Sequence, residues 1–130
     1  MSLFRKTLAV RGAVCCENTV ESVSTEVPAL YRALLAENRI KERHVVSVMF
    51  SVTPDIDCLN PATALRRAGL ASEVPLFAAA EPAVSGMLPR VIRVLITWRG
   101  TGGVVPVYMN GAEALRPDLS TSRSGADRSE

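Results

Sequence analysis

The chain has 130 residues, of which 48% are hydrophobic and 22% are charged, and its formal net charge at pH 7 is +2. This length suits one globular domain with a single core, and so weak a positive charge does not favour a nucleic-acid-binding surface. No apolar run is long enough to cross a membrane, and the first ten residues lack the apolar region and cleavage site of a signal peptide. A cytoplasmic protein is therefore expected.

The first two predicted elements are a strand and a helix. Residues 7–14 (TLAVRGAV) have the composition of a strand, and Gly12 is expected to turn it. Residues 18–39 then place apolar side chains three and four positions apart, which is the spacing of one helical face. These side chains are Val20, Val23, Val27, Leu30 and Leu34. Asn18 or Thr19 is expected to cap the helix.

The middle of the chain predicts a second strand and a short helix. Pro28 interrupts the first helical pattern and is expected to kink or split that helix. Residues 44–52 (HVVSVMFSV) predict a strand buried on both faces, which residues 53–55 (TPD) would end. Residues 61–70 (PATALRRAGL) predict a short helix with a proline near its start and Gly69 at its end.

Three further strands complete the predicted fold. They cover residues 73–81 (EVPLFAAAE), 89–98 (PRVIRVLITW) and 104–109 (VVPVYM), and a single helical turn follows in residues 110–119. The predicted order is β-α-β-α-β-β-β, a mixed α/β (α+β) layout rather than a regularly alternating barrel. One domain is expected over residues 1–119. The small polar residues of 120–130 predict a flexible tail.

The fourth strand carries two arginines, Arg90 and Arg93. Strand side chains alternate between two faces, so residues three apart point in opposite directions. Both faces of this strand are mostly apolar, and at least one guanidinium is therefore expected to be enclosed by protein. An enclosed arginine keeps its charge and needs an anion.

The usual catalytic groups are scarce. The cysteines Cys15, Cys16 and Cys58 are odd in number and have no metal-ligand spacing, so they predict buried, reduced thiols. His44 is the only histidine and lies in a charged segment, and the GTGG turn at 100–103 lacks the lysine of a phosphate-binding loop.

What remains is a set of polar residues at strand ends or within apolar strands. They are Arg11, Glu81, Arg93 and Tyr108, with Arg66 and Arg116 on nearby short helical elements. Each could alone make a structural ion pair or hydrogen bond. Together, several cations with one carboxylate and one phenol suit a small ligand that carries several negative charges.

The same residues lie within a series of motifs that spans the body of the chain. The series comprises VRGA (10–13), SVTPDI (51–56), PATALR (61–66), VPLFAAAE (74–81), GMLPRVIRVL (86–95), VYM (107–109) and ALRPDL (114–119). In this order and at these spacings the chain resembles the monofunctional, AroH-type chorismate mutases. The resemblance implies a barrel-like, mixed-sheet fold in a homotrimer, with sheets packed around a central core and active sites in clefts between subunits.

The resemblance also implies the reaction, the rearrangement of chorismate to prephenate in phenylalanine and tyrosine biosynthesis, without cofactor, metal, nucleic acid or membrane. Arg93 matches the cation beside the breaking C–O bond, and Arg11 and Tyr108 match residues that hold substrate carboxylates. Glu81 matches the carboxylate that accepts from the ring hydroxyl. The remaining matched positions, which would line or flank the substrate, are Arg66, Phe77, Ala78, Ala79, Ala80 and Leu115.

Some positions depart from the family pattern, and two other functions stay open. The departures Asn60, Thr63, Phe77 and Ala78 are expected at the pocket rim, where they would change affinity more than reaction type. The tail is expected to fold over the cleft as a lid. An imine or enamine hydrolase of the RidA type would have a similar trimer without the need for Glu81, Arg93 and Tyr108 together. A non-catalytic trimeric module would bind an aromatic metabolite without converting it.

Overall fold

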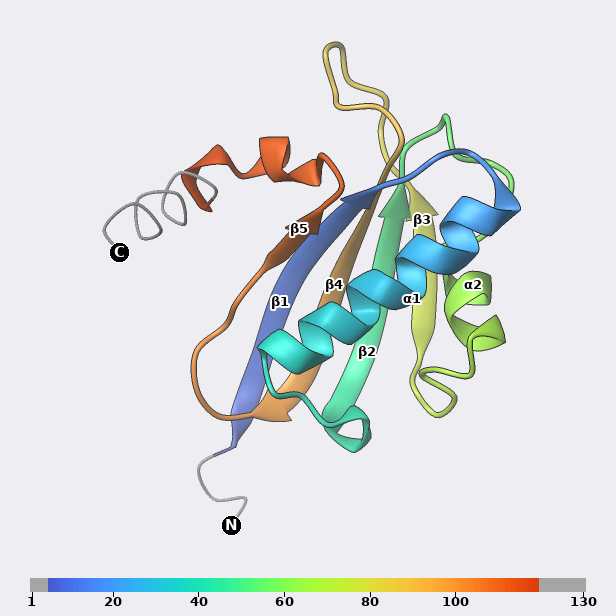
Figure 1. Ribbon diagram of the computed structural model, residues 1–130. Coiled ribbons are helices and arrows are strands. Elements are labelled where there is room, and N and C mark those ends of the chain that lie inside the picture. The colour runs from blue at the N-terminus through green and yellow to red at the C-terminus, as the bar shows by residue number, and fades with distance from the viewer. Residues whose placement is uncertain (1–4, 120–130) are drawn as a thin grey trace.

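A computed structural model describes residues 5–119 of the chain, and the predicted tail and lid lie outside these residues. The strands and α-helices follow the predicted order (Figure 1). They are β1 (Lys6–Cys15), α1 (Val20–Glu37), β2 (Val45–Val52), α2 (Pro61–Arg67), β3 (Leu76–Ala80), β4 (Val91–Gly100) and β5 (Val107–Met109). The predicted helical turn within residues 110–119 is the 3-10 turn η3 (Ala112–Leu115), and a second 3-10 turn, η2 (Glu42–His44), was not predicted. Within the described part of the chain, no helix has the length and apolarity needed to cross a bilayer.

The five strands form one mixed sheet in the order β3-β2-β4-β1-β5. The central strand β4 is antiparallel to both of its neighbours, β1 and β2. The edge strands β5 and β3 are parallel to β1 and β2, respectively. This arrangement confirms the predicted mixed α/β fold.

Both helices cover the same face of this sheet, and the main core lies between them and the strands (Figure 1). Val23, Val27, Leu30 and Leu34 of α1 are buried there, as their spacing predicted, whereas Val20 of the same predicted face is half exposed. The strands contribute Val10, Val14, Val48, Phe50, Ile92, Val94, Ile96 and Trp98. The apolar stripe of α1 therefore packs on the alternate residues of the three central strands.

The opposite face of the sheet carries an exposed apolar row. Met49 of β2 pairs with Phe77 on one side and with Leu95 on the other. These three side chains are 47%, 63% and 36% exposed, respectively. The prediction that β2 is buried on both faces is therefore wrong for a single chain. We call the row of Met49, Phe77 and Leu95 the open face.

The helix α1 is continuous through Pro28, so of the two predicted effects of this proline, a kink or a split, the split is wrong. Pro28 is itself buried in the core, and this packing offsets the loss of one backbone hydrogen bond. Thr19 is the cap, because its side chain accepts from the backbone N–H of Ser22 at 3.0 Å. Asn18 instead holds the loop before α2, accepting from the backbone N–H of Asp57 at 3.0 Å.

The three thiols are free, as predicted, but they differ in burial. Cys16 is buried, whereas Cys15 and Cys58 are partly exposed. Burial raises the pKa of Cys16 to about 11, so this thiol stays protonated at neutral pH.

Gly12 lies within β1 and does not turn the strand, so the prediction of a turn there is wrong. A Cβ at this position would come within 2.8 Å of Leu34 Cδ1 and within 2.9 Å of the backbone oxygen of Val107. Glycine is therefore required here because α1 and β5 both approach the strand closely.

Replacing Gly12 with alanine is expected to destabilise the fold by roughly 1–3 kcal/mol, because a backbone oxygen cannot move aside as easily as a side chain. Denaturant unfolding of the Gly12→Ala variant would measure this change. Gly103→Ala is the matched control, since a methyl group at that position would have no atom within 4 Å. Equal free energies of unfolding in the two variants would contradict the close-packing explanation.

Candidate active site

Arg93 lies on the open side of the sheet, and its partner is a carboxylate. The Nε atom of Arg93 is 3.1 Å from Oε1 of Glu81, the residue that follows β3. The side chain of Arg93 is about half exposed, while that of Glu81 is mostly buried. The anion expected for an arginine in this strand is thus present, although neither Arg93 nor Arg90 is enclosed in a single chain.

Arg90 differs from the prediction because it precedes β4 and is not part of it. Its φ of 52° turns the chain into the strand, and its backbone N–H donates to both carboxylate oxygens of Asp55. Its guanidinium pairs with Glu17 at 3.4 Å, away from Arg93. Of the two arginines, only Arg93 belongs to the candidate site.

Sheet register fixes the position of Glu81. Ser51 of β2 pairs with Arg93 of β4 and donates a hydrogen bond of 2.7 Å to Oε1 of Glu81. The backbone N–H of Glu81 donates to the carbonyl of Val52 at 2.8 Å. Two anchors from β2 therefore hold this carboxylate beside the guanidinium, in addition to the ion pair itself. Sequence analysis did not identify Ser51, because its role depends on strand pairing.

A pocket of about 210 Å³ brings together residues that are distant in the sequence. Its lining includes Arg11, Arg93, Tyr108, Leu115 and Arg116. The first four are residues that the resemblance assigned to the site. They converge because β1 lies between β4 and β5, so that side chains from three neighbouring strands and η3 reach one cavity.

Two guanidinium groups in this pocket have unused donors. Within residues 5–119, Arg11 has no side-chain hydrogen bond or ion pair, and Arg93 uses only its Nε atom. A guanidinium has five N–H donors, and planar oxyanions match its geometry. The pocket therefore offers two cations to a ligand with more than one negative charge.

Arg116, which the sequence grouped with the other candidate cations but to which the resemblance gave no role, forms one wall of the pocket. Its guanidinium carbon lies 6.0 Å from the centre of the Tyr108 ring, and its Nη2 atom pairs with Asp118 at 3.0 Å. The hydrogen bond from Arg116 lowers the pKa of Asp118. This network holds the segment after β5 against the tyrosine.

The remaining predicted site residues lie elsewhere on the chain. Ala78, Ala79 and Ala80 line a separate cavity of about 400 Å³ beside β3, together with Asn60. Asn60 caps α2 by accepting from the backbone N–H of Ala62 at 2.8 Å, which accounts for asparagine at this position.

Arg66 is also separate from the Arg93 pocket. Its guanidinium donates to the backbone carbonyls of Ala71 and Val74, which fixes the loop after α2. Phe77 projects from β3 onto the open face. Within a single chain, the predicted site residues thus form two groups, one around Arg93 and one around β3 and α2.

Comparison with known proteins identifies the family. Residues 7–119 match the family model for chorismate mutase type I. Chorismate mutase AroH of Thermus thermophilus is 38% identical over 119 residues, covering 88% of this chain and 97% of the relative. The AroH protein of Bacillus subtilis is 32% identical over 119 residues, covering 88% of this chain and 94% of its own length.

A solved structure agrees with these relatives. Chorismate mutase from Clostridium thermocellum superimposes with a TM-score of 0.78 at 31% sequence identity, covering 82% of this chain and 98% of that structure. The resemblance seen in the motifs is therefore confirmed over nearly the whole body of the chain. The chain belongs to the type I chorismate mutase family.

Proposed function

We propose that the chain converts chorismate to prephenate, for the biosynthesis of phenylalanine and tyrosine, in the pocket that contains Arg93. Family membership supports the reaction. The observation that supports this pocket is the pairing of Arg93 with an anchored Glu81 beside the unpaired Arg11. A cytoplasmic location, expected from the sequence, belongs to the same proposal.

The chemistry requires a cation and no acid or base. In this pericyclic rearrangement a C–O bond breaks as a C–C bond forms, and no proton moves. Negative charge develops on the ether oxygen in the transition state. A fixed guanidinium beside that oxygen interacts more strongly with the transition state than with the substrate, and this difference accelerates the reaction. Arg93 is the residue to which we assign this role.

The other residues would bind and orient the substrate. The free donors of Arg11 suit one carboxylate, and the hydroxyl of Tyr108 is a second donor on the same side of the pocket. Glu81 is held by Ser51 and Arg93, so it can accept from the ring hydroxyl without reorganising. Holding the flexible enolpyruvyl group over the ring supplies the rest of the acceleration.

We infer that the active protein is a homotrimer in which each site lies between two copies. The two groups of predicted site residues lie toward opposite edges of the sheet, because β3 and β5 are its edge strands. Glu81, which follows β3, reaches Arg93 within one chain, but Arg66 and Phe77 do not line the Arg93 pocket. The β3 edge of one copy beside the β5 edge of the next would bring Arg66 and Phe77 to that pocket.

A ring of three copies would also cover the open face. A head-to-tail contact between unlike edges closes into a ring when the rotation per subunit permits. Met49, Phe77 and Leu95 would then become buried, which removes an exposed apolar row that a lone chain leaves in water. In this arrangement Arg66, Phe77 and Ala78 to Ala80 of one copy would border the Arg93 pocket of its neighbour.

The test of this function is the loss of chorismate absorbance on addition of the purified protein, with identification of the product. We expect rapid conversion to prephenate. The ratio of kcat in H₂O to kcat in D₂O is expected to be about 1, because no proton is transferred in the transition state. A large solvent isotope effect would contradict the mechanism.

Two other outcomes would contradict the proposal and support a different function. Binding of prephenate without any turnover of chorismate would identify a metabolite-binding module. Hydrolysis of an imine derived from an amino acid, without chorismate turnover, would identify an enzyme of the RidA type.

A further inference from the structure

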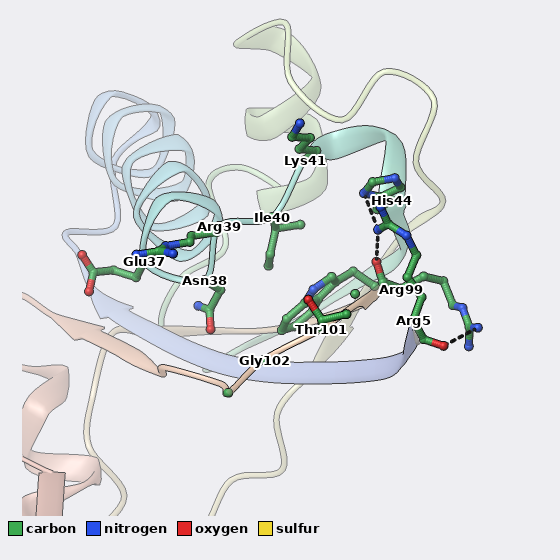
Figure 2. Close-up of a pocket in the computed structure, with 13 residues that line it drawn as sticks. Arg5, Glu37, Asn38, Arg39, Ile40, Lys41, His44, Arg99, Thr101 and Gly102 are labelled. Atoms are coloured by element: carbon green, nitrogen blue, oxygen red, sulfur yellow. Dashed lines mark hydrogen bonds between the residues drawn. The ribbon is translucent and has the colours of Figure 1, made fainter. Parts of the chain in front are cut away.

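A third cavity lies at the other end of β4 from Arg93. It has a volume of about 430 Å³, and its lining comes from the end of α1, from η2 and from the segment after β4 (Figure 2). Gly100 is seven residues beyond Arg93, so the two sites are separated by roughly 23 Å along the strand. The proposed chemistry at Arg93 uses none of the residues of this cavity.

The walls of the cavity are held in place by hydrogen bonds. The side chain of Asn38, at the end of α1, accepts from the backbone N–H of Val105 at 2.6 Å and donates to its carbonyl at 2.9 Å. This pair ties the segment after β4 to the helix. Ile40 and Trp98, both buried, contribute apolar surface to the lining. The cavity is therefore built by the fold and is not a gap beneath a free loop.

Positive charge is concentrated around this cavity. Three cations, Arg5, Arg39 and Lys41, line it against the single carboxylate of Glu37. Arg99 borders the cavity through its backbone, because its side chain donates to Thr7 on the sheet face opposite to Trp98. Within residues 5–119, none of the five charged groups forms an ion pair.

The nearest partners of these cations are neutral. Nη1 of Arg5 lies 3.0 Å from Nδ1 of His44 and 3.3 Å from the carbonyl oxygen of Arg99 (Figure 2). Arg99 in turn donates to the hydroxyl of Thr7 at 2.7 Å and to the carbonyl of Arg5 at 3.1 Å. Glu42, the carboxylate next in sequence to the cluster, accepts from Tyr31 and from the backbone of Ala71 instead.

His44 responds to this positive environment. Arginine can only donate, so Nδ1 of His44 must accept the hydrogen bond from Arg5, which requires an unprotonated Nδ1. Desolvation lowers the pKa of His44, and the positive charges of Arg5, Arg43 and Lys41 lower it further. The imidazole is therefore neutral at pH 7.

A simpler explanation accounts for part of the cluster. Cations near the C-terminus of α1 interact favourably with its backbone dipole, and Arg39 and Lys41 lie in that region. This effect does not account for Arg5, which precedes β1. Nor does it account for the cavity between Arg5 and the end of α1.

We propose that this cavity is a binding site for a small phosphate-type oxyanion, either phosphate itself or the phosphate group of a small organic molecule. A doubly charged oxyanion has several acceptor oxygens and can interact with cations on more than one side of the cavity. A monocarboxylate carries one charge and would leave half of the positive excess unbalanced. A concave site of this size fits a small molecule, not an extended polyanion.

Two spectroscopic reporters lie at the cavity itself. Trp98 is the only tryptophan in the sequence and His44 is the only histidine, and both belong to the lining. We would titrate the full-length protein with sodium phosphate at constant ionic strength, and follow tryptophan fluorescence and the imidazole NMR signals. We expect a saturable change with a dissociation constant of about 1 mM or lower, and a rise in the pKa of His44 as the anion binds.

Matched variants test whether phosphate binds in this cavity. Arg39→Gln with Lys41→Gln removes two cations that have no hydrogen-bonded partner in the described part of the chain, and should weaken phosphate binding at least about tenfold. Arg32→Gln is the control, because Arg32 is exposed in the middle of α1 and lies outside the cavity. Equal affinity of the two variants for phosphate would overturn the proposal. A spectroscopic change that does not saturate, and that chloride produces to the same extent, would also overturn it.

The ligand class is tested by comparing anions. Tighter binding of phenyl phosphate than of phosphate would support a small organic phosphate as the ligand, and equal binding would support phosphate itself. Acetate binding as tightly as phosphate would overturn the assignment to a phosphate-type anion. The rise in the pKa of His44 is measured on the unmodified protein, so the test does not depend on the folding of any variant. It also does not depend on chorismate turnover.

Discussion

Replacing Arg93 with alanine is expected to lower kcat for chorismate about 10²–10³-fold or more, which corresponds to about 3–4 kcal/mol of transition-state stabilisation. The reason is that Arg93 is the cation to which we assign the developing charge on the ether oxygen. Loss of an interaction made only in the transition state lowers kcat and kcat/KM together. Steady-state kinetics of the purified variant would measure both.

Arg90 supplies a closely matched control. Arg90 and Arg93 are 52% and 49% exposed, and each pairs with a glutamate, Glu17 at 3.4 Å and Glu81 at 3.1 Å, respectively. They differ in the pocket that they face, because only Arg93 lines the cavity with Arg11 and Tyr108. Arg90→Ala should therefore leave kcat within about twofold of the original value. Similar losses of kcat in the two variants would mean that general electrostatics, not the position of Arg93, drives the reaction.

Glu81 needs a separate control, because Arg93→Ala also removes its ion pair. Two hydrogen bonds of Glu81 do not involve Arg93. Its carboxylate accepts from Ser51, and its backbone N–H donates to the carbonyl of Val52. An unchanged free energy of unfolding in Arg93→Ala would show that the kinetic loss is not a loss of structure. A large destabilisation would instead assign Arg93 a structural role.

Local patterns in the sequence predicted the order and type of the elements. The helix α1 has its apolar residues three and four apart and a threonine before its first turn, and both signals act over a few residues. The helix α2 likewise begins with Pro61 at its first position, as predicted. Such signals need no knowledge of the rest of the fold, which is why they were reliable.

Errors arose where distant segments decide the outcome. Gly12 was predicted to turn the strand, since nothing nearby in the sequence reveals that Leu34 and Val107 will approach it. Residues 44–52 were predicted to be covered on both sides, because alternation cannot tell a helix-covered face from one that another copy would cover. The apolar side chain of Met49 indicated a covered surface, but the sequence does not show which segment or copy would cover it.

The candidate site shows the same difference between what local sequence patterns predict and what contacts between distant segments decide. The motifs predicted which residues would matter, and Arg11, Arg93, Tyr108 and Leu115 do meet in one pocket. The contact from Ser51 to Glu81 depends on the register of β2 and β3, and the backbone contacts of Arg66 depend on the path of the loop after α2. Neither could be read from the order of the residues alone.

Replacing Met49 with glutamate is expected to break the proposed trimer and abolish turnover. Met49 is 47% exposed in a single chain, so the substitution should change the stability of an isolated subunit by less than about 0.5 kcal/mol. In the trimer the open face is proposed to be buried, and an unpaired buried carboxylate costs several kcal/mol per copy. Sedimentation equilibrium would show a shift from the mass of three chains to that of one.

Val20→Glu is the control for exposed apolar residues in general. Val20 is 50% exposed, similar to Met49, but it lies in the first turn of α1, where a carboxylate interacts favourably with the helix N-terminus. This variant should stay trimeric and active. If Met49→Glu kept the mass and activity of the unmodified protein, the open face would not be the subunit interface. If it became monomeric with full activity, the site would be complete within one chain, and no second copy would contribute residues to it.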